Sequence, residues 1–167
     1  ILREKAKKIA RLDERLQRLI DDMVETMRAV QGVGLAAPQV GVPLRLCVID
    51  VPESEQSSLA GKLLVLYNPQ IVAAKGEQVG PEGCLSIPGY WANVKRADEV
   101  TVRARNRRGK EIKVTGRGLL ARALQHEVDH LNGILFTHHL ESLDELHSIE
   151  EEPTEAEESP HPAAHYG

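Results

Sequence analysis

The sequence has little of several features that would place it in a specialised class of protein. It contains two cysteines in 167 residues, Cys47 and Cys84, which excludes a disulfide framework and suits a reducing compartment. It has no run of about 18 apolar residues, so no transmembrane helix is expected. The N-terminus shows no signal-like apolar stretch either. The composition is that of a globular protein, long enough for one domain with its own core.

Basic residues are missing from the last part of the chain. All 21 Lys and Arg residues lie before residue 137, together with 16 of the 25 acids, whereas residues 137–167 hold 9 acids. The basic charge is spread along the body instead of being grouped, so direct nucleic-acid binding is not indicated. From residue 150 the chain is rich in Glu, Pro and Ala. We expect a folded domain over 1–147 and an acidic, disordered tail over 148–167.

Hydrophobic periodicity predicts two helices separated by strands. Apolar residues at three- and four-residue spacing predict one helix from about Asp13 to Val30, with Asp13 as N-cap, and another from about Gly118 to Leu131. Between them, apolar runs bounded by turn residues predict strands at 44–50, 63–72, 99–104 and 111–115, the last two joined as a hairpin. Strands that precede a helix, without alternating with helices, favour an α+β fold.

The second predicted helix ends in the sequence His126-Glu127-Val128-Asp129-His130. Residues four apart lie on one helix face, so His126 and His130 can present two imidazoles to one cation. Glu127 lies beside this site without having to be a ligand. Two His and an adjacent Glu in this pattern indicate a metal-assisted hydrolase in which the carboxylate is the general base.

A catalytic metal usually has three protein ligands, so one is missing from this motif. Cys47 lies in an apolar strand and is expected to be a buried core residue. His138 and His139 follow the helix closely and are expected to lie at the surface. Cys84 lies among Gly and Pro residues that fix the backbone, and its thiolate would be an efficient ligand. The pattern alone leaves open whether Cys84 is a ligand or a structural thiol. The candidates considered are Cys84, Cys47, Asp50, Glu82, His138, His139 and His147.

Three segments together resemble the peptide deformylase family. Gly32–Gln39 is similar to its first motif, Glu82–Ser86 to its second and His126–His130 to its third, in the family's order, and the resemblance spans roughly residues 1–143. It implies a metal hydrolase that removes the N-formyl group from polypeptides beginning with formylmethionine and releases formate. It also implies an α+β fold in which antiparallel strands pack around a central helix that carries the third motif, with an additional N-terminal helix.

The resemblance also implies a role for each motif residue. It implies metal ligation by Cys84, His126 and His130, with Fe(II) in vivo and Zn(II), Ni(II) or Co(II) as other occupants. Glu127 would act as general base and then as general acid. The Gln39 side-chain amide and the Leu85 backbone N–H would donate to the oxyanion that forms from the formyl oxygen.

Substrate contacts are implied in the same way. The positions that match the methionine slot are Val33, Leu85, Leu119 and Ala123. Gly34 would leave room for the substrate backbone, which pairs like an added strand. Several family members have an arginine at the position of Trp91 that reaches the substrate backbone. Here we expect the aromatic ring of Trp91 to stack against the substrate in place of those hydrogen bonds. Arg96 is similar to the family's partner for Asp129, which would steady the catalytic helix.

The partners implied are N-formylmethionyl nascent peptides, with transient proximity to the ribosome and no membrane. A tail that carries only acids is poorly suited to RNA phosphates, so ribosome docking by the tail is not expected. A bacterial-type cytoplasmic location is expected. The chain opens at Ile1 without an initiator Met, which leaves an organellar targeting segment open.

Two other functions fit the residues less well. A zinc endopeptidase would use the same His-Glu-x-x-His helix but would give no role to Cys84 or to Gly32–Gln39. A non-catalytic metal-binding homologue would be expected to lack Glu127, Gln39 or a ligand, and all are present.

Overall fold

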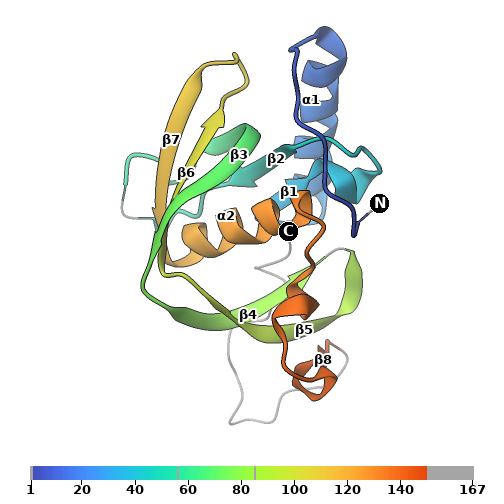
Figure 1. The fold of residues 1–167 in the computed structure, drawn as a ribbon, viewed down its shortest axis with the longest axis vertical. Helices are drawn as coiled ribbons and strands as arrows, with labels where there is room; N and C mark the ends of the chain where they lie inside the picture. The colour runs from blue at the N-terminus through green and yellow to red at the C-terminus, as the bar shows by residue number, and fades with distance from the viewer. Residues whose placement is uncertain (1, 56, 85, 150–167) are drawn as a thin grey trace.

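The computed structural model describes residues 2–55, 57–84 and 86–149. Within these ranges the chain forms two α-helices and two antiparallel sheets (Figure 1). The helices are α1 (Glu14–Ala29) and α2 (Gly118–Leu131), and short 3-10 helices are η1 (Ala37–Val40), η2 (Phe136–His139) and η3 (Leu143–Glu145). The predicted α+β class is confirmed. Neither α-helix in the described ranges is long and apolar enough to cross a membrane.

The larger sheet contains five strands in the order β1-β2-β3-β6-β7. Its strands are β1 (Gly34–Ala36), β2 (Leu46–Asp50), β3 (Leu63–Lys75), β6 (Glu99–Arg105) and β7 (Glu111–Arg117). Four of them overlap the strands predicted from the apolar runs, and β6 and β7 form the predicted hairpin, in which Gly109 takes a positive φ of 81°. The short strand β1 was not predicted, and it lies at the edge of the sheet.

Helix α1 begins and packs as the sequence predicts. Asp13 caps it, accepting a hydrogen bond from the Leu16 backbone N–H at 2.9 Å. One face of the helix buries apolar side chains against the larger sheet, namely those of Leu16, Ile20, Met23 and Met27. The packing of this face is sufficient to hold a helix of 16 residues that would be marginal in isolation.

The smaller sheet differs most from the sequence prediction. It consists of β4 (Gln78–Cys84), β5 (Ile87–Arg96) and β8 (His147–Ser148), in the order β4-β5-β8. The sequence does not predict these strands because Gly and Pro interrupt β4 and begin β5, and both residues weaken the strand signal. The backbone nevertheless pairs from Gln78 with Arg96 to Cys84 with Ile87, with a register shift beside Cys84.

Helix α2 lies between the two sheets, as Figure 1 shows. The face turned to the larger sheet is apolar and belongs to a cluster of buried side chains from β1, β2, β3, β6 and β7. Leu120, Leu124 and Leu131 are fully buried in that cluster. The central helix therefore has a fixed position, from which its other face presents polar side chains to β4 and β5.

Candidate metal centre and active site

Cys84, His126 and His130 form a buried cluster of donor atoms. Cys84 ends β4, and the two His lie one turn apart on α2. Their donor atoms all lie within 4.8 Å of one another. Cys84 Sγ lies 3.2 Å from His130 Nε2, which lies 3.1 Å from His126 Nε2. Of the described residues, no other set of three His, Cys, Asp or Glu side chains is grouped in this way.

The spacing of this cluster suits a small transition-metal cation. A tetrahedral ion bonded to sulfur and nitrogen at ordinary lengths separates its donors by roughly 3.3 to 3.6 Å. The two short separations come close to that range, and the side chains are 1% to 4% exposed. A thiolate with two imidazoles suits Zn(II) or Fe(II), and three ligands leave a fourth position open. The other cysteine, Cys47, is buried in the core as predicted.

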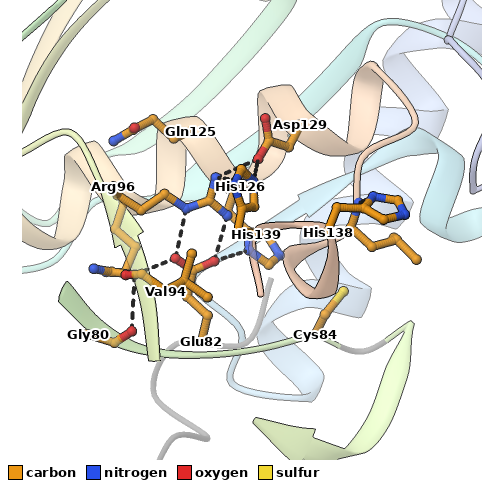
Figure 2. Close-up of polar contacts among 12 residues, drawn as sticks. Gly80, Glu82, Cys84, Val94, Arg96, Gln125, His126, Asp129, His138 and His139 are labelled. Atoms are coloured by element: carbon orange, nitrogen blue, oxygen red, sulfur yellow. Dashed lines mark hydrogen bonds and ion pairs between the residues drawn. The ribbon is translucent and has the colours of Figure 1, made fainter. Parts of the chain in front are cut away.

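Glu82 on β4 fixes the orientation of His126. Its Oε1 lies 2.8 Å from His126 Nδ1, so the ring presents Nε2 to the cluster. Arg96 donates to both oxygens of the same carboxylate, Nη2 to Oε1 at 2.7 Å and Nε to Oε2 at 2.8 Å. Arg122 Nη1 also donates to Oε2. Figure 2 shows the side chains of Glu82, Arg96 and His126 gathered at this point.

This polar network is almost completely removed from water. Glu82 is 1% exposed and Arg96 is 5% exposed, so an unpaired charge there would cost several kcal/mol. Burial by itself raises the pKa of Glu82, but the hydrogen bonds from Arg96 and His126 outweigh it and hold the pKa well below its usual range. Burial lowers the pKa of Arg96, and Glu82 and Asp129 more than reverse that effect. Both groups therefore stay charged and hold each other in place.

The predicted pair of Arg96 and Asp129 is present, with Arg96 Nη1 2.5 Å from Asp129 Oδ2. His138 and His139 are both exposed, as expected. The Nε2 of His139 also lies 2.8 Å from the same Asp129 oxygen, because η2 turns the chain back toward α2. Burial raises the pKa of Asp129, but His139 and Arg96 lower it overall. His138 accepts a hydrogen bond from the Leu135 backbone N–H at 2.9 Å, which stabilises that turn.

Glu127 lies next to the ligand cluster on α2 and is 1% exposed. Burial, assisted by the charges of Glu82 and Asp129, raises its pKa to about 7 against the opposing effect of His126 and Arg96. Its Oε1 has no hydrogen-bond partner among the described residues. A Cβ on Gly34 would lie 2.6 Å from Glu127 Oε2, so the glycine makes room for this carboxylate. Glu127 is thus a buried carboxylate whose pKa lies close to neutral pH.

Gln39 directs its amide nitrogen toward the ligand cluster. Its Oε1 accepts a hydrogen bond from the Ala36 backbone N–H at 2.8 Å, which fixes the orientation of the amide. Its Nε2 therefore faces Cys84 Sγ at 3.5 Å and Ser86 Oγ at 3.4 Å. The second donor expected from the sequence, the backbone N–H of Leu85, lies outside the described residues, as does the Leu85 side chain expected in the slot.

A narrow cavity adjoins Glu127 and brings together three of the residues expected to hold methionine, Val33, Leu119 and Ala123. Its volume of about 10 Å³ is enough for one water molecule, so a longer side chain requires it to widen. Of the described residues, those that line it are Val33, Gly34, Glu82, Leu119, Arg122, Ala123, His126 and Glu127. We call this cavity the side-chain slot.

Trp91 does not line the side-chain slot. Its ring packs against that of His147, with ring centroids 4.5 Å apart and an interplanar angle of 32°. The two residues face each other across the pair of strands β5 and β8. His147, another of the candidate ligands, thus lies in an aromatic contact.

Sequence reasoning considered Glu82 only as a possible ligand and did not consider Arg122. The available signal for Arg122 was its position four residues before His126, on the same helix face, among apolar neighbours. A charged residue in such a place has to find a buried partner. The identity of that partner depends on β4, a strand that the sequence did not predict.

Comparison with known proteins gives one consistent result. The family described as polypeptide deformylase matches residues 1–146. The peptide deformylase of Acetivibrio thermocellus is 56% identical over 137 residues, 82% of this chain and 76% of that protein. The one from Dehalococcoides mccartyi strain CBDB1 is 49% identical over 149 residues, 89% of this chain and 86% of that protein.

Solved structures agree with this result. The crystal structure of a peptide deformylase from Legionella pneumophila has a TM-score of 0.78 at 50% identity, covering 86% of this chain and 82% of that one. A peptide deformylase from Synechococcus elongatus in complex with actinonin has a TM-score of 0.78 at 42% identity, covering 86% and 75%. The donor cluster, the buried glutamate and these matches lead to one conclusion: the chain belongs to the polypeptide deformylase family.

Proposed function

We propose that this protein hydrolyses the N-formyl group of formylmethionine at the start of newly made polypeptides, releasing formate and a free amine. The observation that carries the proposal is the grouping of Cys84, His126 and His130 beside the buried carboxylate of Glu127. The chain's similarity to peptide deformylases over most of its length supports it. Nothing in the site favours an endopeptidase or a non-catalytic role.

Cys84, His126 and His130 are the proposed metal ligands, with Glu82 holding the His126 ring. A bound divalent cation acts there as a Lewis acid and lowers the pKa of a water molecule. We propose Fe(II) as the ion in the cell, with Zn(II), Ni(II) or Co(II) able to occupy the same ligands. The mixture of one thiolate and two imidazoles supports this group of ions without selecting among them.

Glu127 moves the protons of the reaction. It takes a proton from the attacking water, whose oxygen adds to the formyl carbon, and it passes that proton to the amine nitrogen as the C–N bond breaks. Gln39 Nε2 donates a hydrogen bond to the formyl oxygen as its negative charge develops, and the Leu85 backbone N–H is proposed as the second donor.

The side-chain slot receives the methionine side chain between Val33, Leu119 and Ala123, with Leu85 proposed as a further wall. The peptide then pairs as an added strand along β1 at Gly34, because β1 is an edge strand of the larger sheet. Trp91 is proposed to offer aromatic surface to the residues that follow methionine.

The remaining proposals concern the setting of the reaction. The substrates are nascent chains, which places the protein near the ribosome for short periods in a bacterial-type cytoplasm. The predicted tail is ordered at its first two residues, because Ser148 pairs with Tyr90 in β5 and the Ile149 backbone N–H donates to the Gly89 carbonyl at 2.8 Å. Residues 150–167 lie outside the described part of the chain, so the disorder of the rest of the tail, and the catalytic domain over 1–147, stay predictions. An acidic tail would be repelled by RNA phosphates and is proposed not to dock there.

The deciding experiment assays anaerobically purified full-length protein on formyl-Met-Ala-Ser, with formate measured and metal content determined on the same sample. We expect formate release that is abolished by chelation and restored by Fe(II) or Zn(II). In Cys84→Ala we expect loss of bound metal and of activity together, whereas the matched variant Cys47→Ala retains both. A metal-loaded wild type that releases no formate would overturn the proposed function.

A further inference from the structure

Arg122 occupies an unusual position for an arginine. It lies on α2 one turn before His126 and is 4% exposed. Its Nη1 is saturated, donating to Glu82 Oε2, to the Val94 carbonyl at 3.0 Å and to the Gly80 carbonyl at 3.3 Å. Its Nε donates to the Gln78 side chain at 3.3 Å. The guanidinium is therefore held rigidly by β4 and β5.

The third nitrogen of this guanidinium, Nη2, is buried and has no hydrogen-bond partner among the described residues. A charged donor in that condition is costly and gains from any acceptor that reaches it. One side of Nη2 is closed, because a Cβ on Gly80 would lie only 3.2 Å from it. Arg122 also lines the side-chain slot, together with Val33, Leu119 and Ala123.

We propose that Arg122 is a specificity-determining residue whose Nη2 donates a hydrogen bond to the terminal acceptor of the substrate's first side chain. The acceptor is the thioether sulfur of methionine, or the more strongly accepting oxygen of methionine sulfoxide. The slot then selects by a polar contact as well as by shape. This inference rests on the proposed deformylase function and adds the chemical class of side chain that the slot prefers.

The test compares three peptides that differ only in that side chain: formyl-Met-Ala-Ser, its norleucine analogue and its methionine sulfoxide analogue. Norleucine replaces sulfur with a methylene group and keeps the shape. In the wild type we expect kcat/KM for methionine to exceed that for norleucine by about threefold to tenfold, as one weak hydrogen bond gives. We expect the sulfoxide to be hydrolysed within about tenfold of methionine, because its oxygen finds a donor.

Arg122→Leu removes the donor and leaves Glu82 paired with Arg96. In this variant we expect the methionine and norleucine rates to become equal and the sulfoxide rate to fall relative to methionine by about 100-fold, since its oxygen is buried unpaired. The ratio between peptides is measured within one protein, so a loss of stability or of metal cancels from it. Arg45→Met is the matched control, because Arg45 binds the end of α2 at Leu131 and lies outside the slot. It should retain the wild-type ratios.

Two results would overturn the inference: equal wild-type rates on methionine and norleucine, or the same ratios in wild type and in Arg122→Leu. If Arg122→Leu does not fold, the wild-type comparison decides alone. If no formyl peptide is hydrolysed, the proposed function has failed, and the slot is then tested by calorimetric binding of Met-Ala-Ser and its norleucine analogue. A threefold to tenfold preference for Met-Ala-Ser would support the Arg122 contact, and equal affinities would overturn it.

Discussion

The two faces of α2 are built on opposite principles. Toward the five-stranded sheet the helix buries Leu120, Leu124 and Leu131 in a continuous apolar cluster. Toward β4 and β5 it presents Arg122 and His126, which meet the buried carboxylate of Glu82. Burial of the apolar face involves no directional bonds and stabilises roughly in proportion to the area buried. The polar face stabilises only when each donor meets its acceptor, and that requirement fixes the direction of the metal ligands.

This contrast predicts that changes on the two faces separate stability from chemistry. Substitutions on the apolar face should lower the free energy of unfolding and leave the properties of each folded molecule intact. Substitutions on the polar face should alter metal affinity or turnover beyond their effect on folding. The following variants test that division.

The largest effect is expected for Glu127→Gln, which removes the general base. We expect kcat on formyl-Met-Ala-Ser to fall by about 10²–10⁴ while bound metal is retained. Thermal stability should not fall, because the change removes a buried carboxylate oxygen that has no partner among the described residues. Asp144→Asn, at an exposed position in η3, is the control and should keep full turnover. Unchanged turnover in Glu127→Gln would remove Glu127 from the reaction.

Leu124→Ala tests the apolar face. The side chain is fully buried, so we expect a loss of about 2–5 kcal/mol in the free energy of unfolding, measured by urea denaturation. Metal affinity, measured by competition with a chelator at a temperature where the variant is folded, should stay within about twofold. A large drop in metal affinity would contradict the division between the faces.

Glu82→Gln tests the polar face. The amide can no longer hold His126 and the two guanidiniums as a charged carboxylate does, so we expect metal affinity to fall by about 10- to 100-fold. Leu124→Ala serves as the comparison, because it destabilises the fold without touching this network. If both variants lose metal to the same extent, Glu82 acts only through general stability and not through the orientation of His126.

The sequence predicted the apolar face well and the polar face in part. The stripe on α1 and the apolar residues of α2 repeat with the helical period, and this periodicity is a local signal. The contact between Cys84 and the two His joins residues more than 40 positions apart, and spacing alone left it open until three motifs were compared with a family. The roles of Arg122 and His139 depend on β4 and η2, elements whose Gly, Pro and short length give almost no periodic signal.

The smallest effect is expected at Glu99 on β6, which pairs with Lys75 and with Arg117, the residue that precedes α2. Glu99 receives hydrogen bonds from Lys75, at 3.0 Å, and from Arg117, and these lower its pKa. A lowered pKa means that the folded state binds the proton less tightly than the unfolded state, so the stabilisation is present above the ordinary pKa and is lost as the pH falls. Glu99→Gln should therefore destabilise slightly at pH 7, and the difference from wild type should shrink as the pH falls through the lowered pKa of Glu99. High salt should reduce the difference at pH 7 as well, because exposed charges are screened. A difference that grew on acidification would reverse the sign assigned to this pair.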